Sequence, residues 1–386
     1  MEWLFGSATL GVIGLAAWVW PQVQQRGLQN WLPEYWSTRA LRADPCPGEP
    51  VHLLLCIADH FEPKLDNASP QQAQQRVDRW CQEYPECFAG FRDSDGFFPR
   101  HTFFYPAEEY EPAYLHQLAD LCRKGFGEVE IHLHHDNDTA ENLRHTLLSF
   151  KKKLREQHGL LSIHRHSNEV GYAFIHGNWA LDNSHPAGRW CGINNELDIL
   201  RETGCFTDMT MPSAPSPTQT TTINSIYYAC DDPQRPKSHD RGYRVDTCNR
   251  PEKSLLLIQG PLLLDWSRRK WGLLPRIENA CLQGNQIPTA QRLKLWLRAC
   301  IQVPQRPDWY FVKLHTHGAN EKNMPVLLGE PMRAFHQMLR QRLEDDRNFH
   351  YHYVTAREMA NLVFAAEAGF QGTVAEARDY CWLRGD

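Results

Sequence analysis

Apolar runs that end in polar residues, separated by segments with helical spacing, constrain the fold of this chain most strongly. The run VHLLLCIADHF (51–61) is apolar until its last residues, as expected for a strand buried on both faces that opens into a site at its C-terminal end. Residues 69–84 then begin with serine and proline, a pattern typical of a helix start, and keep helical spacing. Strand and helix patterns alternate along the rest of the chain, which predicts an α/β fold, a distorted (β/α) barrel.

The composition is that of a folded protein without a nucleic-acid partner. Hydrophobic residues make up 42% of the 386 residues, charged residues make up 23%, and the formal net charge is -5. This charge provides no basic field for a phosphate backbone, so nucleic acid is not expected to bind. We expect one α/β barrel domain over residues 51–365, preceded by a linker over residues 26–50 and followed by a C-terminal tail over residues 366–386.

An uncharged stretch near the N-terminus predicts a single membrane anchor, which we assign to residues 1–25. Residues 3–20 carry no charge and, as a helix, nearly cross the hydrocarbon core of a bilayer. The bulky sequence WVWPQ at its end favours an anchor over a cleaved signal peptide. Basic residues, Arg26, Arg39 and Arg42, occur only after the stretch, so the positive-inside rule places the main domain on the cytoplasmic side of a bacterial inner membrane. An apolar helix docked on the domain itself is the alternative.

Polar residues gather at the C-terminal ends of three predicted strands. The first strand ends in Asp59 and His60, the second in the segment VEIHLHHDND (129–138), and the third in the segment LHTHG (314–318). In α/β barrels such strand ends share one edge, so these side chains are expected to form one site. Imidazole and carboxylate groups bind divalent cations, and a cation with an open position activates water. The pattern predicts a metal-dependent hydrolase, with a polar edge strand as the alternative for residues 129–138.

At these residues the chain resembles the polysaccharide deacetylase family, also called the NodB-homology or carbohydrate esterase family. The segments IADHF (57–61), HTFF (101–104) and GEVEIHLHHDND (127–138) resemble the family motifs TFDDG, ATFF and GHEIGLHxxxH, and VKLH (312–315) resembles its closing LLH strand. The resemblance spans roughly residues 51–363 and implies removal of an N-acyl group, usually acetyl, from an amino sugar. The implied substrate is a surface polysaccharide or a lipid-linked glycolipid precursor. Family members usually act outside the cytoplasm, opposite to the side that the charges indicate.

The resemblance also implies roles for individual residues. Asp59 takes the catalytic-base position, or a metal position in an alternative register. His60, His134 and Asp138 take the metal positions. The implied cofactor is a divalent metal, with zinc the first choice and cobalt or nickel as alternatives. The closest counterpart of the substrate-contacting motif is IHGNWALDN (175–183).

Within that segment, His176, Asn178 and Trp179 are candidates for substrate contact, with a strand-end turn around a packed tryptophan as the alternative. His315 resembles the late histidine that acts as general acid toward the leaving amine, and His317 is the second candidate for this role.

Two other functions compete with the deacetylase. A glycoside hydrolase on a similar barrel needs two carboxylates that flank the glycosidic bond, and Asp59, Glu62 and Asp138 are its candidates. A non-catalytic membrane component that binds glycan in the same groove is the other alternative.

Overall fold

The computed structural model describes residues 20–246 and 250–385. Residues 1–19 of the predicted anchor lie outside these ranges. Within the described residues, no helix has both the length and the apolar character needed to cross a membrane. The membrane anchor and the cytoplasmic location of the domain therefore stay predictions.

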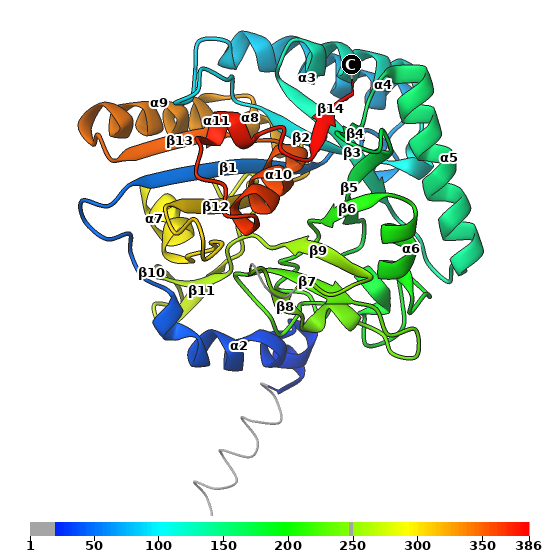
Figure 1. The fold of residues 1–386 in the computed structure, drawn as a ribbon, viewed down its shortest axis with the longest axis horizontal. Helices are drawn as coiled ribbons and strands as arrows, with labels where there is room; N and C mark the ends of the chain where they lie inside the picture. Colours follow the sequence, from blue (N-terminus) through cyan, green and yellow to red (C-terminus); the bar gives the residue numbers. More distant parts are fainter. Residues whose placement is uncertain (1–19, 247–249, 386) are drawn as a thin grey trace, which may run out of the picture.

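A mixed sheet of twelve strands forms the centre of the fold (Figure 1). Its main path runs in the order β12, β1, β2, β3, β5, β6, β9, β7, β8, and the first seven strands of this path are parallel. The strands of this path are β1 (Val51–His60), β2 (His101–Pro106), β3 (Gly127–Leu133), β5 (Val170–His176), β6 (Cys205–Asp208), β7 (Ile226–Cys230), β8 (Tyr243–Arg244), β9 (Ser254–Ile258) and β12 (Trp309–Thr316). The strands off this path are β4 (Ser162–His164), β13 (Phe349–Tyr353) and β14 (Trp382–Arg384). Strands β10 (Leu263–Lys270) and β11 (Leu274–Glu278) form a separate antiparallel pair.

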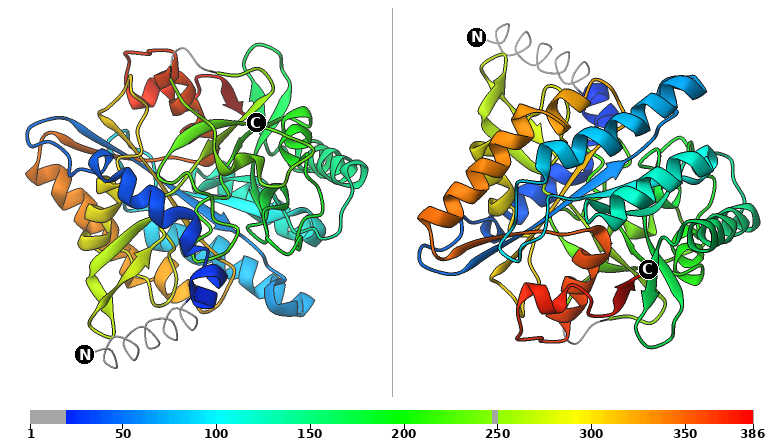
Figure 2. Two further views of the ribbon diagram at one scale, coloured as in Figure 1. Left: turned by 90° about the horizontal axis from the view of Figure 1, so that it is seen from below. Right: turned by 90° about the horizontal axis from the view of Figure 1, so that it is seen from above.

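Helices cover the outer face of the parallel strands. Figure 2, seen from above, shows α9, α3, α4 and α5 side by side over this face. The helices are α2 (Leu28–Ser37), α3 (Pro70–Phe88), α4 (Pro112–Arg123), α5 (Ala140–His158), α6 (Glu196–Glu202), α7 (Ala290–Arg298), α8 (Met324–Leu327), α9 (Glu330–Asp345), α10 (Ala356–Glu367) and α11 (Val374–Ala377).

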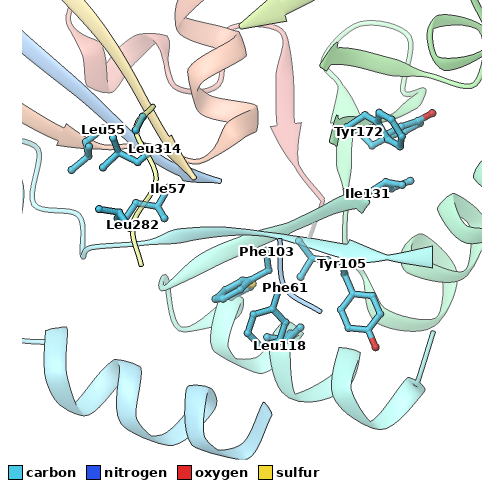
Figure 3. Packing of buried hydrophobic residues seen from close by; sticks show 14 of the residues in the cluster. Leu55, Ile57, Phe61, Phe103, Tyr105, Leu118, Ile131, Tyr172, Leu282 and Leu314 are labelled. Carbon is cyan, nitrogen blue, oxygen red and sulfur yellow. The ribbon is translucent and has the colours of Figure 1, made fainter. Parts of the chain in front are cut away.

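Two apolar clusters lie on opposite faces of the parallel strands, because successive side chains of a strand point to opposite faces. On the outer face, Leu55 and Ile57 of β1 belong to one cluster with Leu118 of α4 (Figure 3). On the inner face, Leu54 and Cys56 belong to a second cluster that includes most of α10. Residues of β1, β5, β9 and β12 all belong to this inner cluster, so the sheet curves around it.

The predicted mixed α/β fold with a parallel sheet is confirmed. Within the described residues no strand pair joins β12 to β9, so the hydrogen-bonded path stays open where a closed barrel would continue. Lys313 of β12 bridges this side of the curved sheet instead, because its ammonium group donates to the carbonyls of Met209 and Met211, each at 2.5 Å. The helix starts and ends also follow the sequence: Ser69 and Thr139 cap α3 and α5, and Gly159 ends α5 in a left-handed conformation.

The segments assigned to the linker and to the tail carry ordered structure that packs on the domain. Helix α2 lies in the linker segment, and its fully buried Trp31 joins the inner cluster. In the tail segment, β14 pairs with β4, and the Asn361 side chain bonds backbone atoms of Cys381 and Trp382. Neither feature was predicted from the sequence, because α2 contains Pro33 and the tail is rich in glycine and charged residues.

Candidate metal centre

The C-terminal ends of β1, β3, β5 and β12 lie together, as the sequence predicts. The strand register pairs Asp59 with Thr316 and Leu133 with His176. Alternation along the strands then sorts the polar side chains onto two faces. His60 and His132 follow the inner face, while Asp59 and His176 follow the outer face with the residues that pack against the helices. The polar strand ends therefore form two neighbouring groups. We call the one around His60 and His132 the inner group.

Three side chains of the inner group, from His60, Glu62 and His132, have the composition and spacing of a metal site. Their ligand atoms lie within 4.8 Å of one another, and all three side chains are buried. The His132 Nε2 atom lies 3.0 Å from Glu62 Oε1, and the His134 Nε2 atom lies 3.2 Å from the same oxygen. Neither ring nitrogen of His60 has a hydrogen-bond partner, and Glu62 Oε2 has none either. The ligand atoms of His60, Glu62 and His132 are close enough to one another to bind one cation, and His134 adds a further nitrogen beside Glu62.

The opposite ring nitrogens of His132 and His134 are bonded to oxygen atoms. His132 Nδ1 donates to the Ile175 carbonyl at 2.9 Å, and His134 Nδ1 donates to Glu108 Oε1 at 2.5 Å. Such bonds fix the orientation of a metal-binding histidine and leave its Nε2 as the ligand atom. With each Nδ1 engaged in this way, the Nε2 atom of each imidazole is the one that faces the Glu62 carboxylate. That contact is favourable only with a cation or a proton between the atoms.

The charges around Glu62 favour its ionised form. Burial alone would raise the pKa of the Glu62 carboxyl, but hydrogen bonds from His132 and His134 hold this pKa well below its ordinary value. Burial would lower the pKa of His134, yet its bonds to Glu108 and Glu62 raise the pKa to about 10. Burial holds the pKa of His60 far below its ordinary value, so this imidazole is neutral at pH 7. The group thus combines an ionised carboxylate, a neutral His60 and a protonated His134, and a metal ion at His134 Nε2 would take the place of that proton.

Aromatic rings form one wall of the group. Trp179 has a left-handed backbone with φ 61°, which is rare for a bulky residue. Its ring lies 4.7 Å from that of His60 and 5.1 Å from that of His315, measured between centroids. The His317 ring stacks on His60 with centroids 4.7 Å apart. Trp179 and His317 are half-buried, while His60 and His315 lie behind them.

Asp59, the predicted base or ligand, lies outside this group. Its carboxylate oxygens are bonded on the outer face, Oδ2 to His101 Nδ1 at 3.1 Å and Oδ1 to the Gly318 N–H at 2.6 Å. A Cβ atom on Gly318 would come within 2.1 Å of Asp59 Oδ2, so only glycine permits this contact. Asp59 therefore holds the backbone that follows His317, and its oxygens do not face the other predicted ligands.

Asp138 and His176 also lie apart from the inner group. Asp138 Oδ2 is 3.2 Å from His135 Nδ1, and Asp138 Oδ1 accepts from the Thr139 N–H. His176 is fully buried on the outer face, so no surface of it is open to substrate. Of the predicted substrate residues, Asn178 and Trp179 are the ones with exposed surface.

Sequence reasoning missed two residues of the inner group in their present roles. Glu62 was proposed only as a glycosidase carboxylate, although it lies two residues after His60 and carries the same metal-binding chemistry. Glu108 carries no sequence signal, because its contact with His134 depends on how the segment after β2 folds back over the strand ends.

A third group of possible ligands, Asp93, Asp95 and His352, belongs to an ion network. Arg378 contacts both aspartates at 3.0 Å, and His352 bonds Asp95 at 2.8 Å. His352 Nε2 is paired with His52 Nδ1 at 3.0 Å. Protein groups therefore already pair the charges of this third group and the ring nitrogens of His352.

No protein-family model matches the chain, and no curated protein matches it. Among solved structures, the 4-alpha-glucanotransferase from Thermococcus litoralis is similar, with 10% sequence identity and a TM-score of 0.42. The similarity covers 81% of this chain and 40% of that chain, so this chain spans about two fifths of the length of that enzyme. A likeness of this degree assigns neither a family nor an activity. The fold and the inner group define an α/β protein with a candidate metal centre.

Proposed function

We propose that this chain is a metal-dependent hydrolase that removes an N-acyl group from an amino sugar of a polysaccharide or glycolipid. One observation carries the proposal: His132 Nε2 and His134 Nε2 lie 3.0 and 3.2 Å from the same oxygen of Glu62, while both Nδ1 atoms are engaged by other oxygens. Two imidazoles and a carboxylate form a donor set that suits zinc and, with the same geometry, cobalt or nickel.

Glu62, His132 and His134 would hold a divalent cation, and when bound this cation would supply Lewis-acid chemistry for an acyl carbonyl and for water. His60, with two unpartnered ring nitrogens, is the fourth candidate donor. His317 lies at the half-exposed edge of the group, where it can move a proton between water and the leaving amine. Burial lowers the pKa of His317, which keeps its imidazole neutral at pH 7 and able to accept that proton.

Two features support an amino sugar as the proposed substrate class: the aromatic wall of the inner group, and the resemblance of the adjoining strands to deacetylase motifs. The half-buried Trp179 offers a flat apolar face of the kind that stacks on sugar rings. The segments that resemble the deacetylase motifs, 101–104 and 127–138, form β2 and β3 and lead into the group. His315 lies behind Trp179, which favours His317 as the residue that contacts the leaving group.

The test is acetate release by the purified full-length chain. The protein is stripped with a chelator, reloaded with zinc, cobalt or nickel, and incubated with oligomers of N-acetylglucosamine and with surface-polysaccharide oligomers. We expect acetate only after metal is restored, none from His132→Asn, and normal release from His145→Asn, which changes an exposed histidine on α5. No acetate with any metal would contradict the deacetylase.

A glycoside hydrolase is the second candidate, because the Glu62 and Glu108 carboxylates lie on opposite sides of the His134 ring. Paired carboxylates of this kind can act as acid and base on a glycosidic bond. New reducing ends that form without acetate and survive chelation would favour this function. Bound oligosaccharide without either product would indicate a glycan-binding protein.

A further inference from the structure

A second group of metal-binding side chains lies on the outer face of the strands. It consists of His135 after β3, His176 at the end of β5, Cys191 in the following loop and Glu196 at the start of α6. Their ligand atoms lie within 4.8 Å of one another, and the group shares no residue with the inner group. The two groups neighbour each other because His134 and His135 are consecutive.

The distances in this outer group match a tetrahedral metal site. Glu196 Oε1 lies 3.1 Å from His135 Nε2 and 3.9 Å from His176 Nε2, and Glu196 Oε2 lies 3.4 Å from Cys191 Sγ. A tetrahedral zinc ion with bonds of about 2.0–2.3 Å separates its ligand atoms by roughly 3.3–3.8 Å. The four ligand atoms lie within 4.8 Å of one another, so they could close on one ion with shifts of up to about 1 Å.

His176 is the residue that protein contacts alone leave unexplained. Its side chain is fully buried, and neither ring nitrogen has a hydrogen-bond partner. Buried polar atoms are nearly always satisfied, so two such nitrogens aimed into a group of possible ligands indicate an additional binding partner. An ion pair between His135 and Glu196 would leave these nitrogens unsatisfied.

The charge of Glu196 requires compensation as well. Its carboxylate is fully buried, and among the ion pairs of the described residues it contacts only His135 and His176. The Asp182 N–H donates to Glu196 Oε2 at 2.6 Å and orients the carboxylate. Asp138 Oδ2 lies 3.2 Å from His135 Nδ1. Carboxylates at this position commonly orient a histidine whose other ring nitrogen binds a metal.

We propose that His135, His176, Cys191 and Glu196 bind a structural zinc ion. All four ligands come from the protein and the group is buried, whereas catalytic sites keep a position open for water or substrate. The ion would tie the loop over residues 177–195 to the segment after β3, where the Asp138 N–H also donates to the Cys191 carbonyl at 2.9 Å. That loop carries Trp179, so the outer zinc would position the wall of the inner group.

Cobalt substitution tests this site without relying on enzymatic activity. Cys191 is the cysteine in these two groups, so cobalt bound through its thiolate should give a sulfur-to-metal charge-transfer band in the near ultraviolet. We expect the full-length chain to hold two zinc ions and, when loaded with two equivalents of cobalt, to show this band. Cys191→Ser should abolish the band and leave one ion, while Cys205→Ser, which changes a buried cysteine outside both groups, should change neither.

Variants should remove the ion of the inner site and the ion of the outer site independently of each other. His132→Asn should remove one ion and keep the charge-transfer band, whereas Cys191→Ser should keep the inner ion. The proposal is overturned if the wild-type chain shows no such band with cobalt, or if Cys191→Ser retains the full metal content of the wild type. The wild-type spectrum decides the matter even if the Cys191 variant does not fold.

Discussion

His132 Nε2 lies 3.0 Å from Glu62 Oε1 in a region where both side chains are almost fully buried. Since His132 Nδ1 already bonds the Ile175 carbonyl, its Nε2 is the ring atom that faces the carboxylate oxygen. In a buried setting such a contact is costly unless a proton or a metal cation lies between the two atoms. This relationship connects the end of β1 to the end of β3 and underlies the proposed metal centre.

Replacing Glu108 by Gln should weaken metal binding without removing a ligand. Glu108 accepts the Nδ1 proton of His134, and loss of such a supporting carboxylate typically lowers metal affinity by about 10–100-fold. Isothermal titration of stripped protein with zinc measures the change. Glu111→Gln is the matched control, because the Glu111 side chain makes no capping bond at the start of α4. Unchanged zinc affinity in Glu108→Gln would refute this supporting role.

Replacing Asp59 by Asn distinguishes a positioning residue from a ligand. Asp59 accepts the Gly318 N–H next to His317, so the variant should retain its inner metal and lose activity by about a hundredfold through displacement of His317. Elemental analysis and the rate of acetate release are measured on the same preparation. Loss of the inner metal would instead show that Asp59 is a ligand, as the sequence resemblance implies.

Replacing Gly177 by Ala should disturb the inner group through sterics alone. A Cβ atom on Gly177 would lie 2.3 Å from the His134 ring, so the ring must shift from its position beside Glu62. We expect zinc affinity to fall while the fold persists, as followed by circular dichroism. Gly90→Ala is the control, because no atom lies within 4 Å of the added methyl group there. Equal zinc affinity in both variants would mean that His134 does not bind metal.

Replacing Arg357 by Met should destabilise the fold and spare the metal centre. Arg357 is buried and contacts Glu128 at 2.8 Å, at the start of β3 and away from the strand ends that carry the inner group. Removal of one partner of such a buried pair costs about 3–5 kcal/mol of folding free energy. Urea unfolding measures this loss, and elemental analysis of the folded variant should give the wild-type metal content. A variant of wild-type stability would contradict this reading of the network.

The parallel strands, and the edge of the sheet on which the polar residues meet, could be predicted from the sequence because both follow from local patterns. The alternation of side chains along a strand also argues against one assignment that the family resemblance implies, namely Asp59 and His60 at one metal ion. Asp59 and His60 are consecutive in one strand and must point to opposite faces, so they cannot both face one ion unless the strand is distorted. The same argument separates His134 from His135 where the chain leaves β3.

The remaining parts of the site depend on contacts between segments far apart in the sequence. Glu108 reaches His134 across 26 positions and Glu196 reaches His135 across 61 positions. These contacts depend on loop conformations that no periodic pattern encodes. Helix α2 is similar, since its place on the domain depends on burial of Trp31 and on bonds from Asn30 to the carbonyls of Pro217 and Gln219.

Diffraction from a crystal of the zinc-loaded protein, measured at the zinc absorption edge, would locate the bound ion. We expect an anomalous peak within about 2.0–2.2 Å of Glu62 Oε1, His132 Nε2 and His134 Nε2. A zinc-loaded crystal with no peak among these three atoms would contradict the metal centre, even if zinc were bound at the outer group.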